Sequence, residues 1–132
     1  MSCLSKGKVK LMKEIKNMKI TDVSLTMADH GCFTFWITVE GAGTGCNIGG
    51  YCIGHGYLGS KEFMVEHGGG LIAIMKIMDV VGVERWEDLK GKYCRVEDNG
   101  IGSTITKIGN IIKDNWFDLK EFFGNFSEES EQ

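Results

Sequence analysis

A glycine-dense stretch at residues 41–59 is the most informative feature of this chain for binding chemistry. Its sequence, GAGTGCNIGGYCIGHGYLG, places Tyr51, His55 and Tyr57 among the glycines. Glycines let a backbone approach a ligand closely and adopt positive φ, while tyrosine rings offer flat stacking surfaces. This pattern is typical of a small-molecule or nucleotide pocket. Turns and bulges also use glycines, so a purely structural interpretation stays open.

Residues suited to holding a nucleotide also occur outside this stretch. Aromatic rings can stack on a base, and lysine or arginine can pair with a phosphate group. For each aromatic residue the alternative is a role as a core or interface anchor. The predicted ligand-binding residues are Trp36, Gly49, Gly50, Tyr51, Tyr57, Arg95, Lys107 and Lys113.

No pattern in the sequence identifies a catalytic group. His30, His55 and His67 lie outside any recognisable nucleophile motif, and the glycine stretch matches neither a Walker loop nor GxGxxG. Cys46, Cys52 and His55 have spacings that a zinc site could use, but the CxxC pair typical of tight metal sites is absent. We therefore predict a binding protein rather than an enzyme, with no catalytic residue, no metal and no cofactor.

Hydrophobic periodicity predicts the elements that would position these residues. Residues 19–28 and 32–40 alternate like strands around a compact turn at residues 29–31, and residues 47–53 could form a third strand. Helical spacing predicts a main helix over residues 69–81, capped by Gly82. The remaining predicted elements are a turn of helix at 84–89, strands at 92–97 and 101–112 joined by a hairpin at 98–100, and a short amphipathic helix at 116–123.

Together these elements predict an α+β fold, with a mostly antiparallel sheet of about five strands packed with one main helix and a short C-terminal helix. With 132 residues and 42% apolar content, the chain has the size of one domain. We expect this domain at residues 19–123, between a basic N-terminal tail at 1–18 and an acidic C-terminal tail at 124–132. The main helix carries only Lys76 and Asp79 as charges, so the sheet or another subunit must cover most of it.

Composition also limits the cellular setting. No apolar run reaches the ~20 residues of a membrane span, and the N-terminus is too polar for a signal peptide. The five cysteines have no paired spacing, which fits a reducing compartment. A net charge of −3 argues against general nucleic-acid binding. We expect a cytoplasmic protein without a membrane or nucleic-acid partner.

Three segments resemble a family of small phage and prophage proteins of Firmicutes: GGYCIG at 49–54, WEDLKGKYCRVE at 86–97 and KIGNIIKDNWFD at 107–118. The similarity extends over residues 19–123. This family resembles, or includes, the first type of Thoeris anti-defence protein, which sequesters the cyclic ADP-ribose signal of bacterial TIR enzymes without cleaving it. The resemblance implies a cyclic ADP-ribose or cyclic nucleotide ligand, a homo-oligomer with pockets at subunit contacts, and the cytoplasm of an infected bacterial host.

A protein-interaction module is the alternative function. A phage-encoded inhibitor could bind a host defence or nucleic-acid enzyme through its surface, with its acidic tail and low net charge mimicking nucleic acid. Thermal shifts with a panel of cyclic nucleotides would distinguish the two functions, because only the sequestering protein would be stabilised by one of them.

Overall fold

The structure is a computed structural model of the 132-residue chain. It describes residues 14–29, 31–41, 43–56, 62–65, 68–98 and 105–130, and of these it describes the backbone alone at 28, 29, 65 and 126–130. Within these residues, two α-helices pack on a seven-stranded antiparallel sheet. The predicted α+β fold class is therefore confirmed.

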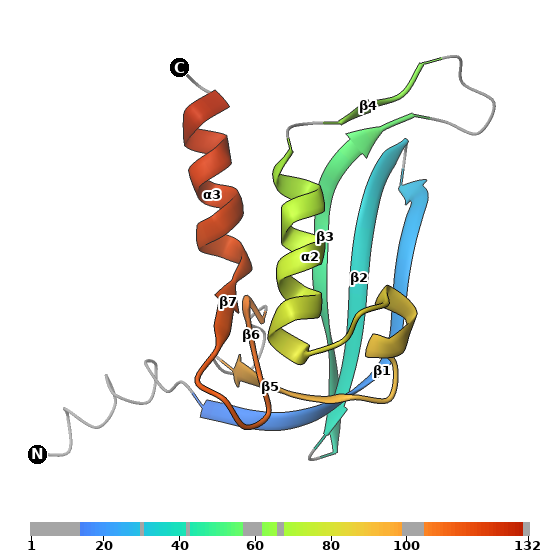
Figure 1. The fold of residues 1–132 in the computed structure, drawn as a ribbon. Helices are drawn as coiled ribbons and strands as arrows, with labels where there is room; N and C mark the ends of the chain where they lie inside the picture. Colours follow the sequence, from blue (N-terminus) through green and yellow to red (C-terminus); the bar gives the residue numbers. More distant parts are fainter. Residues whose placement is uncertain are drawn as a thin grey trace, which may run out of the picture.

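One sheet contains every strand of the described residues. Its strands are β1 (Glu14–Asp29), β2 (Cys32–Gly41), β3 (Thr44–His55), β4 (Met64–Val65), β5 (Tyr93–Asp98), β6 (Lys107–Gly109) and β7 (Trp116–Asp118). They are ordered β4-β3-β2-β1-β5-β6-β7, and each neighbouring pair is antiparallel. Figure 1 shows β1, β2 and β3 as long strands side by side, with the shorter β5, β6 and β7 at one end of them.

Glycines with positive φ form the turns between the first three strands. Gly31, between β1 and β2, has a φ of 81°, and Gly43, between β2 and β3, has a φ of 78°. Glycine adopts this conformation without the steric cost that other residues meet. The predicted hairpin around residues 29–31 is confirmed, although His30 itself lies outside the described residues.

β1 is long enough to belong to both halves of the sheet. Its first residues pair with β5 as far as Lys19↔Tyr93, and its later residues pair with β2. The register with β2 shifts between Ile20 and Asp22, which adds one residue to β1 at this point. A bulge of this kind bends a strand. Accordingly, Figure 1 shows β1 bent, with its N-terminal part running beside β5.

Helices cover one face of the sheet. α2 (Gly69–Val81) turns Ala73, Ile77 and Val80 toward the sheet. The short helix η1 (Trp86–Leu89) and the helix α3 (Leu119–Ser130) lie beside α2 (Figure 1). Burying each large apolar side chain contributes about 1.5–3 kcal/mol, so this layer is the main stabilising contact of the fold. The strand residues buried in it include Met18, Ile20, Phe35, Ile37, Val39, Ile48 and Val96.

The main helix has the predicted bounds. α2 ends at Val81, and the φ of 94° of Gly82 together with its N–H bond to the Met78 carbonyl makes a left-handed cap. At the other end of α2, a Cβ added to Gly70 would lie only 2.5 Å from Cβ of Ile53 on β3. The missing side chain at Gly70 therefore lets α2 approach the sheet closely.

In the C-terminal third of the chain, the observed elements differ from the predicted ones. Trp116–Asp118 forms β7, so the helix predicted at 116–123 begins only at Leu119. Burial of the cross-strand pair Ile108↔Phe117 explains this, because tertiary packing outweighs weak local propensity. Of the strand predicted at 101–112, the described residues that form a strand are those of β6, residues 107–109. The sheet has seven strands rather than about five, because the short strands β4 and β7 were not predicted.

Both predicted tails contribute residues to regular elements. β1 begins at Glu14, and Met18, predicted as the last tail residue, is buried in the core. α3 continues to Ser130, within the segment predicted as the acidic tail. Its start is capped by Asp118, whose Oδ1 accepts a hydrogen bond from the Glu121 N–H at 3.0 Å. The folded part of the chain therefore extends beyond residues 19–123.

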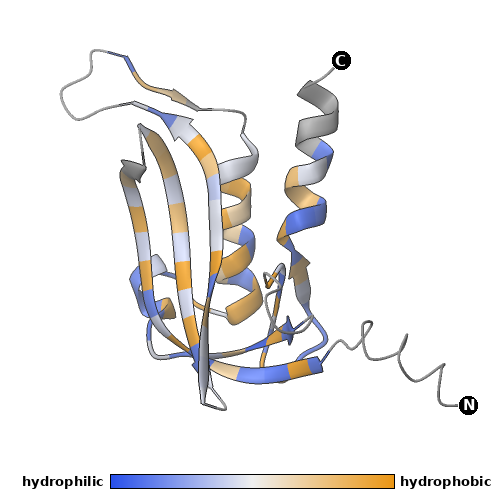
Figure 2. Cartoon of the chain, turned by 180° about the vertical axis from the view of Figure 1, so that it is seen from behind, coloured by the Kyte–Doolittle hydropathy of each residue, from blue (hydrophilic) through white to orange (hydrophobic). Residues whose placement is uncertain are grey.

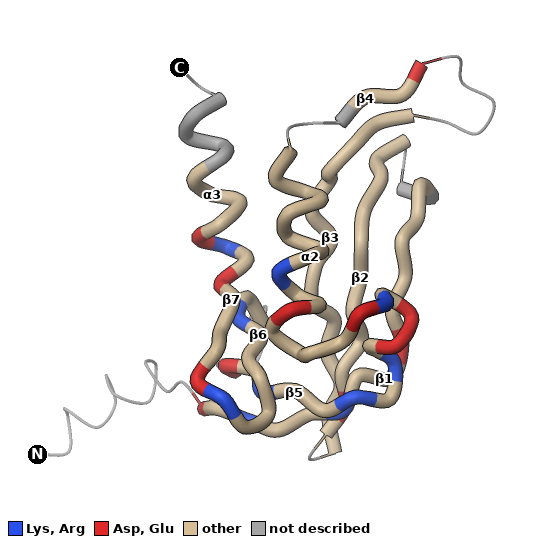
Figure 3. Tube along the Cα trace, in the orientation of Figure 1, with Lys and Arg blue, Asp and Glu red and all other residues tan. Residues whose placement is uncertain are grey.

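The sheet face that points away from α2, termed the outer face, is more polar. Figure 2 shows apolar and polar residues alternating along the long strands, the pattern expected when one face is buried and the other solvated. Charged residues gather around β5 and η1, whereas β3 contains no Lys, Arg, Asp or Glu (Figure 3). The charges of η1 lie on the helical side of the sheet, where its Trp86 packs against buried Phe35, so they do not belong to the outer face.

Candidate functional site

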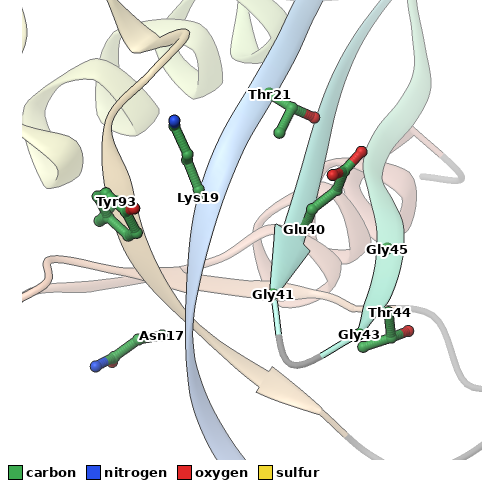
Figure 4. A pocket seen from close by; sticks show the side chains of 9 residues that line it. All are labelled: Asn17, Lys19, Thr21, Glu40, Gly41, Gly43, Thr44, Gly45 and Tyr93. Atoms are coloured by element: carbon green, nitrogen blue, oxygen red, sulfur yellow. The ribbon is translucent and has the colours of Figure 1, made fainter.

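A polar cleft of about 690 Å³ opens on the outer face next to the turn between β2 and β3 (Figure 4). Strand alternation positions its residues: Met18 points into the core, so its neighbours Asn17 and Lys19 point outward. The glycines of the turn contribute backbone rather than side chains. The cleft is lined by Asn17, Lys19, Thr21, Glu40, Gly41, Gly43, Thr44, Gly45 and Tyr93.

Lys19 is the centre of a row of polar side chains that crosses three strands. It pairs with Glu40 of β2 on one side and with Tyr93 of β5 on the other. Figure 4 shows its side chain directed away from Glu40. Of the ion pairs formed within the described residues, none involves Lys19. Its ammonium group is therefore available to an anionic ligand.

The rest of the cleft supplies a flat ring and hydrogen-bonding groups. The Tyr93 side chain is 56% exposed, so its ring can stack on a planar ligand. A Cβ added to Gly43 would meet no atom within 4 Å, so ligand atoms can reach this turn closely. The Asn17 amide and the Thr44 hydroxyl can donate or accept hydrogen bonds.

Three predicted ligand-binding residues lie together elsewhere on the outer face. Trp36 is 39% exposed and pairs with Gly49, where the register of β2 and β3 shifts. Gly49 and Gly50 have φ values of 118° and 84°. A Cβ added to Gly50 would lie 2.5 Å from the indole of Trp36, so this ring covers Gly50. The Trp36 indole therefore packs over Gly50, whereas a Cβ added to Gly49 would meet the carbonyl oxygen and ring of Phe35.

Tyr51 points to the opposite face of the sheet. Its ring stacks on Phe123 of α3, with centroids 4.2 Å apart and an interplanar angle of 16°. Burial, and secondarily the charge of Asp118, raises the pKa of the Tyr51 phenol. Tyr51 therefore anchors α3 and does not share a surface with Trp36. Tyr57 lies outside the described residues.

Arg95 lies on β5 at the border of the cleft, because it pairs across the sheet with Asn17. Its guanidinium group has partners within the chain. Nε donates to the Asn110 carbonyl at 2.6 Å, and Nη2 donates to the Lys113 carbonyl at 2.8 Å. The group also lies 5.1 Å from the centre of the Trp116 ring. Arg95 therefore holds the loop between β6 and β7 in place.

The predicted ligand-binding residues thus occupy three separate places: the Trp36 bulge, the α3 contact of Tyr51, and the β5–β7 end of the sheet. Lys107 belongs to the third, where its Nζ lies 3.6 Å from a Glu97 carboxylate oxygen. Sequence analysis missed Asn17, Lys19, Thr21 and Tyr93, the cleft residues from β1 and β5. Their outward positions, alternating with buried Met18 and Cys94, were the pattern that could have identified them.

A scan against protein-family models, a search of curated proteins and a search of solved structures each found no match. Among the described helices, none combines the length and the apolar character that crossing a bilayer requires. The functional interpretation therefore depends on the geometry of the cleft.

Proposed function

We propose that this protein captures a small nucleotide signal and holds it without cleaving it. The observation that carries the proposal is the cross-strand pair Lys19↔Tyr93, which sets an ammonium group beside an exposed aromatic ring. An aromatic ring can stack on a base, and an ammonium group can pair with phosphate. Cyclic ADP-ribose is the first ligand to test, followed by cyclic di- and trinucleotides, in keeping with the resemblance to phage anti-defence proteins.

The size of the cleft supports a ligand of this class. Small-molecule sites enclose about 300–1,000 Å³, and the volume of about 690 Å³ falls within this range. The cleft is open on one side, so a second copy of the chain could complete the enclosure. We therefore propose a homo-oligomer, as the resemblance implies.

Sequestration depends on affinity and copy number rather than on a chemical step. A protein that acts in this way must outnumber the signal and bind it with a Kd below the concentration that activates the effector. Stacking on Tyr93 and pairing with Lys19 would supply this affinity, because both contacts are made in the bound state. The biological outcome would be a bacterial defence pathway deprived of its signal during phage infection.

Calorimetric titration with cyclic ADP-ribose, cyclic dinucleotides and cyclic trinucleotides tests the proposal. We expect one of these ligands to bind the wild type, and Tyr93→Ala to weaken that binding by about tenfold or more, because a stacking contact contributes about 1–3 kcal/mol. Lys19→Ala should weaken it to a similar extent, because the phosphate would lose a charge-assisted contact. Ligand recovered after denaturation should be chemically intact.

Two matched variants serve as controls. Tyr93→Phe keeps the ring and should retain most of the affinity. Lys120→Ala removes a lysine from the exposed surface of α3, outside the cleft, and should leave binding unchanged. Absence of binding across the nucleotide panel, or equal affinity in Tyr93→Ala and wild type, would contradict the proposed ligand site. Recovery of a cleaved ligand would indicate an enzyme instead.

The exposed surface of α2 favours the second candidate function, inhibition of a host enzyme by surface contact. Leu71, Ile72 and Met75 are 61%, 41% and 59% exposed on this helix. Apolar side chains gathered on one helix face are typical of protein contacts. Specific capture of a host defence or nucleic-acid enzyme from an infected-cell lysate, together with no response to the nucleotide panel, would support this function.

A further inference from the structure

A cluster of two cysteines and one histidine lies on the sheet where β2 begins and β3 ends. Cys32, Cys52 and His55 place their potential ligand atoms within 4.8 Å of one another. Both cysteines carry thiols rather than a disulfide. The cluster is separate from the polar cleft, with which it shares no residue.

A bulge in β3 brings two of these side chains to the same face. Cys52 and His55 are three residues apart, so in a regular strand they would point to opposite faces. The pairing of β2 with β3 passes from Phe33↔Gly54 to Thr34↔Cys52 and skips Ile53. This extra residue shifts the alternation by one position. His55 then joins Cys52 on one face, where its cross-strand partner is Cys32.

We propose that Cys32, Cys52 and His55 bind one Zn²⁺ ion through two thiolates and one imidazole. Tetrahedral zinc, with bonds of about 2.3 Å to sulfur and about 2.0–2.1 Å to nitrogen, separates a sulfur ligand atom from a nitrogen ligand atom by about 3.5–3.6 Å. Sγ of Cys52 lies 3.6 Å from Nε2 of His55. The spacing of the two atoms therefore matches one edge of the coordination tetrahedron.

Coordination by these residues balances the charge of the ion. Each cysteine loses its proton when it binds the ion, so two protons are released to solvent. The two thiolates carry two negative charges and the imidazole is neutral, so together they neutralise Zn²⁺. Three protein ligands leave the fourth tetrahedral position to water, as in open zinc sites. His55 is exposed and the cysteines are partly exposed, so the ion can enter from solvent.

An apolar cleft of about 390 Å³ borders this site. His55 lines it together with Met27, Phe33, Gly54, Phe63 and Met64. This cleft places an apolar surface beside the exposed ligand His55. An exogenous ligand that replaced the zinc-bound water could also bury apolar surface in this cleft.

Cobalt titration of the reduced, metal-free full-length chain tests the proposal. We expect one equivalent of Co²⁺ to produce thiolate-to-cobalt charge-transfer absorption and the visible bands of tetrahedral cobalt, and Zn²⁺ to displace it. Cys52→Ala and Cys32→Ala each remove a direct ligand, so each should weaken metal binding by at least the roughly tenfold that loss of an outer-shell partner causes, and should reduce the charge-transfer band. His55→Ala should weaken binding while leaving both sulfur ligands present.

Cys46→Ala is the matched control, because Cys46 lies on β3 with Cys52 but packs against the core and is outside the cluster. This variant should bind cobalt like the wild type. At the same zinc concentration, zinc should raise the Tm of the wild type and of Cys46→Ala by more than that of His55→Ala, whose circular dichroism should match the wild type. No thiolate–cobalt band in the reduced wild type, or an equal loss in Cys46→Ala and Cys52→Ala, would overturn the proposal. The test needs no nucleotide, so its outcome is independent of the proposed function.

Discussion

Adjacent residues of β5 show how strand position determines the role of a side chain. Tyr93 is 56% exposed on the outer face, whereas Cys94, the next residue, is completely buried in the core. Alternation of the strand places the phenol in the polar cleft of the outer face and the thiol among apolar side chains. Under the proposed function, a substitution of Tyr93 would therefore change ligand affinity, whereas a substitution of Cys94 would change stability.

Burial raises the pKa of the Cys94 thiol to about 12, from 9.0 in an exposed cysteine. Between these values the unfolded chain loses the proton while the folded chain keeps it. The free energy of unfolding should therefore fall as pH rises above 9, by about 1.4 kcal/mol per pH unit from this group. Urea denaturation under reducing conditions at pH 8 and pH 10.5 measures the decrease.

Cys94→Ala provides the control for other groups that titrate in this range. This variant should be less stable at both pH values because of the cavity it creates. Its loss of stability between pH 8 and pH 10.5 should nevertheless be about 2 kcal/mol smaller than that of the wild type. Equal losses in the two proteins would show that the Cys94 thiol does not titrate as its burial implies.

At the scale of elements, one side chain joins the loop between β6 and β7 to the end of α2. Asn110 Nδ2 donates to the Val80 carbonyl at 2.8 Å, and Oδ1 accepts from the N–H groups of Ile112 and Lys113, each at 2.8 Å. Arg95 binds carbonyls of the same loop from the sheet side. The loop is therefore held between the helix and β5.

Asn110→Ala should lower the free energy of unfolding by about 2 kcal/mol, because it removes the partners of three backbone groups. Asn115→Ala in the same loop is the matched control, since the hydrogen bonds described for Asn115 use its backbone. Urea denaturation of both variants measures the difference. Equal stability of the two would mean that solvent replaces the Asn110 contacts without cost.

At the scale of the whole molecule, α2 leaves an apolar surface uncovered. Its buried residues face the sheet, whereas Leu71, Ile72 and Met75 are exposed. Sequence analysis expected either the sheet or another subunit to cover the helix, and the sheet covers only one side. A second copy of the chain could cover this side, but that contact would be separate from one that encloses the cleft, because the cleft opens on the opposite face of the sheet.

Met75→Glu should shift the protein toward the monomer, because a charge buried at an apolar contact costs several kcal/mol. Light scattering coupled to size-exclusion chromatography measures the mass. Lys120→Glu is the control. Lys120 lies on the exposed surface of α3, outside the apolar surface of α2, so this change should leave the mass unchanged. A monomeric wild type, or a Met75→Glu variant of wild-type mass, would exclude α2 as the oligomer contact.

The fold class and most elements could be predicted from the sequence because their patterns are local. Helical spacing placed α2 at its observed bounds, and alternation placed the hairpin of β1 and β2. Patterns of this kind need only neighbouring residues. The short strand β7 was missed because its conformation depends on pairing with β6, not on its own propensity.

The two candidate sites depend on tertiary structure. Lys19 stands beside Tyr93 only because β1 pairs with β5, and a residue skipped in β3 brings His55 to Cys52 and Cys32. Strand register and bulges follow from contacts between residues far apart in the chain, so they cannot be predicted from local periodicity. The sequence by itself determined the kinds of element and the residues available for binding. The pairing of strands decided which of those residues meet.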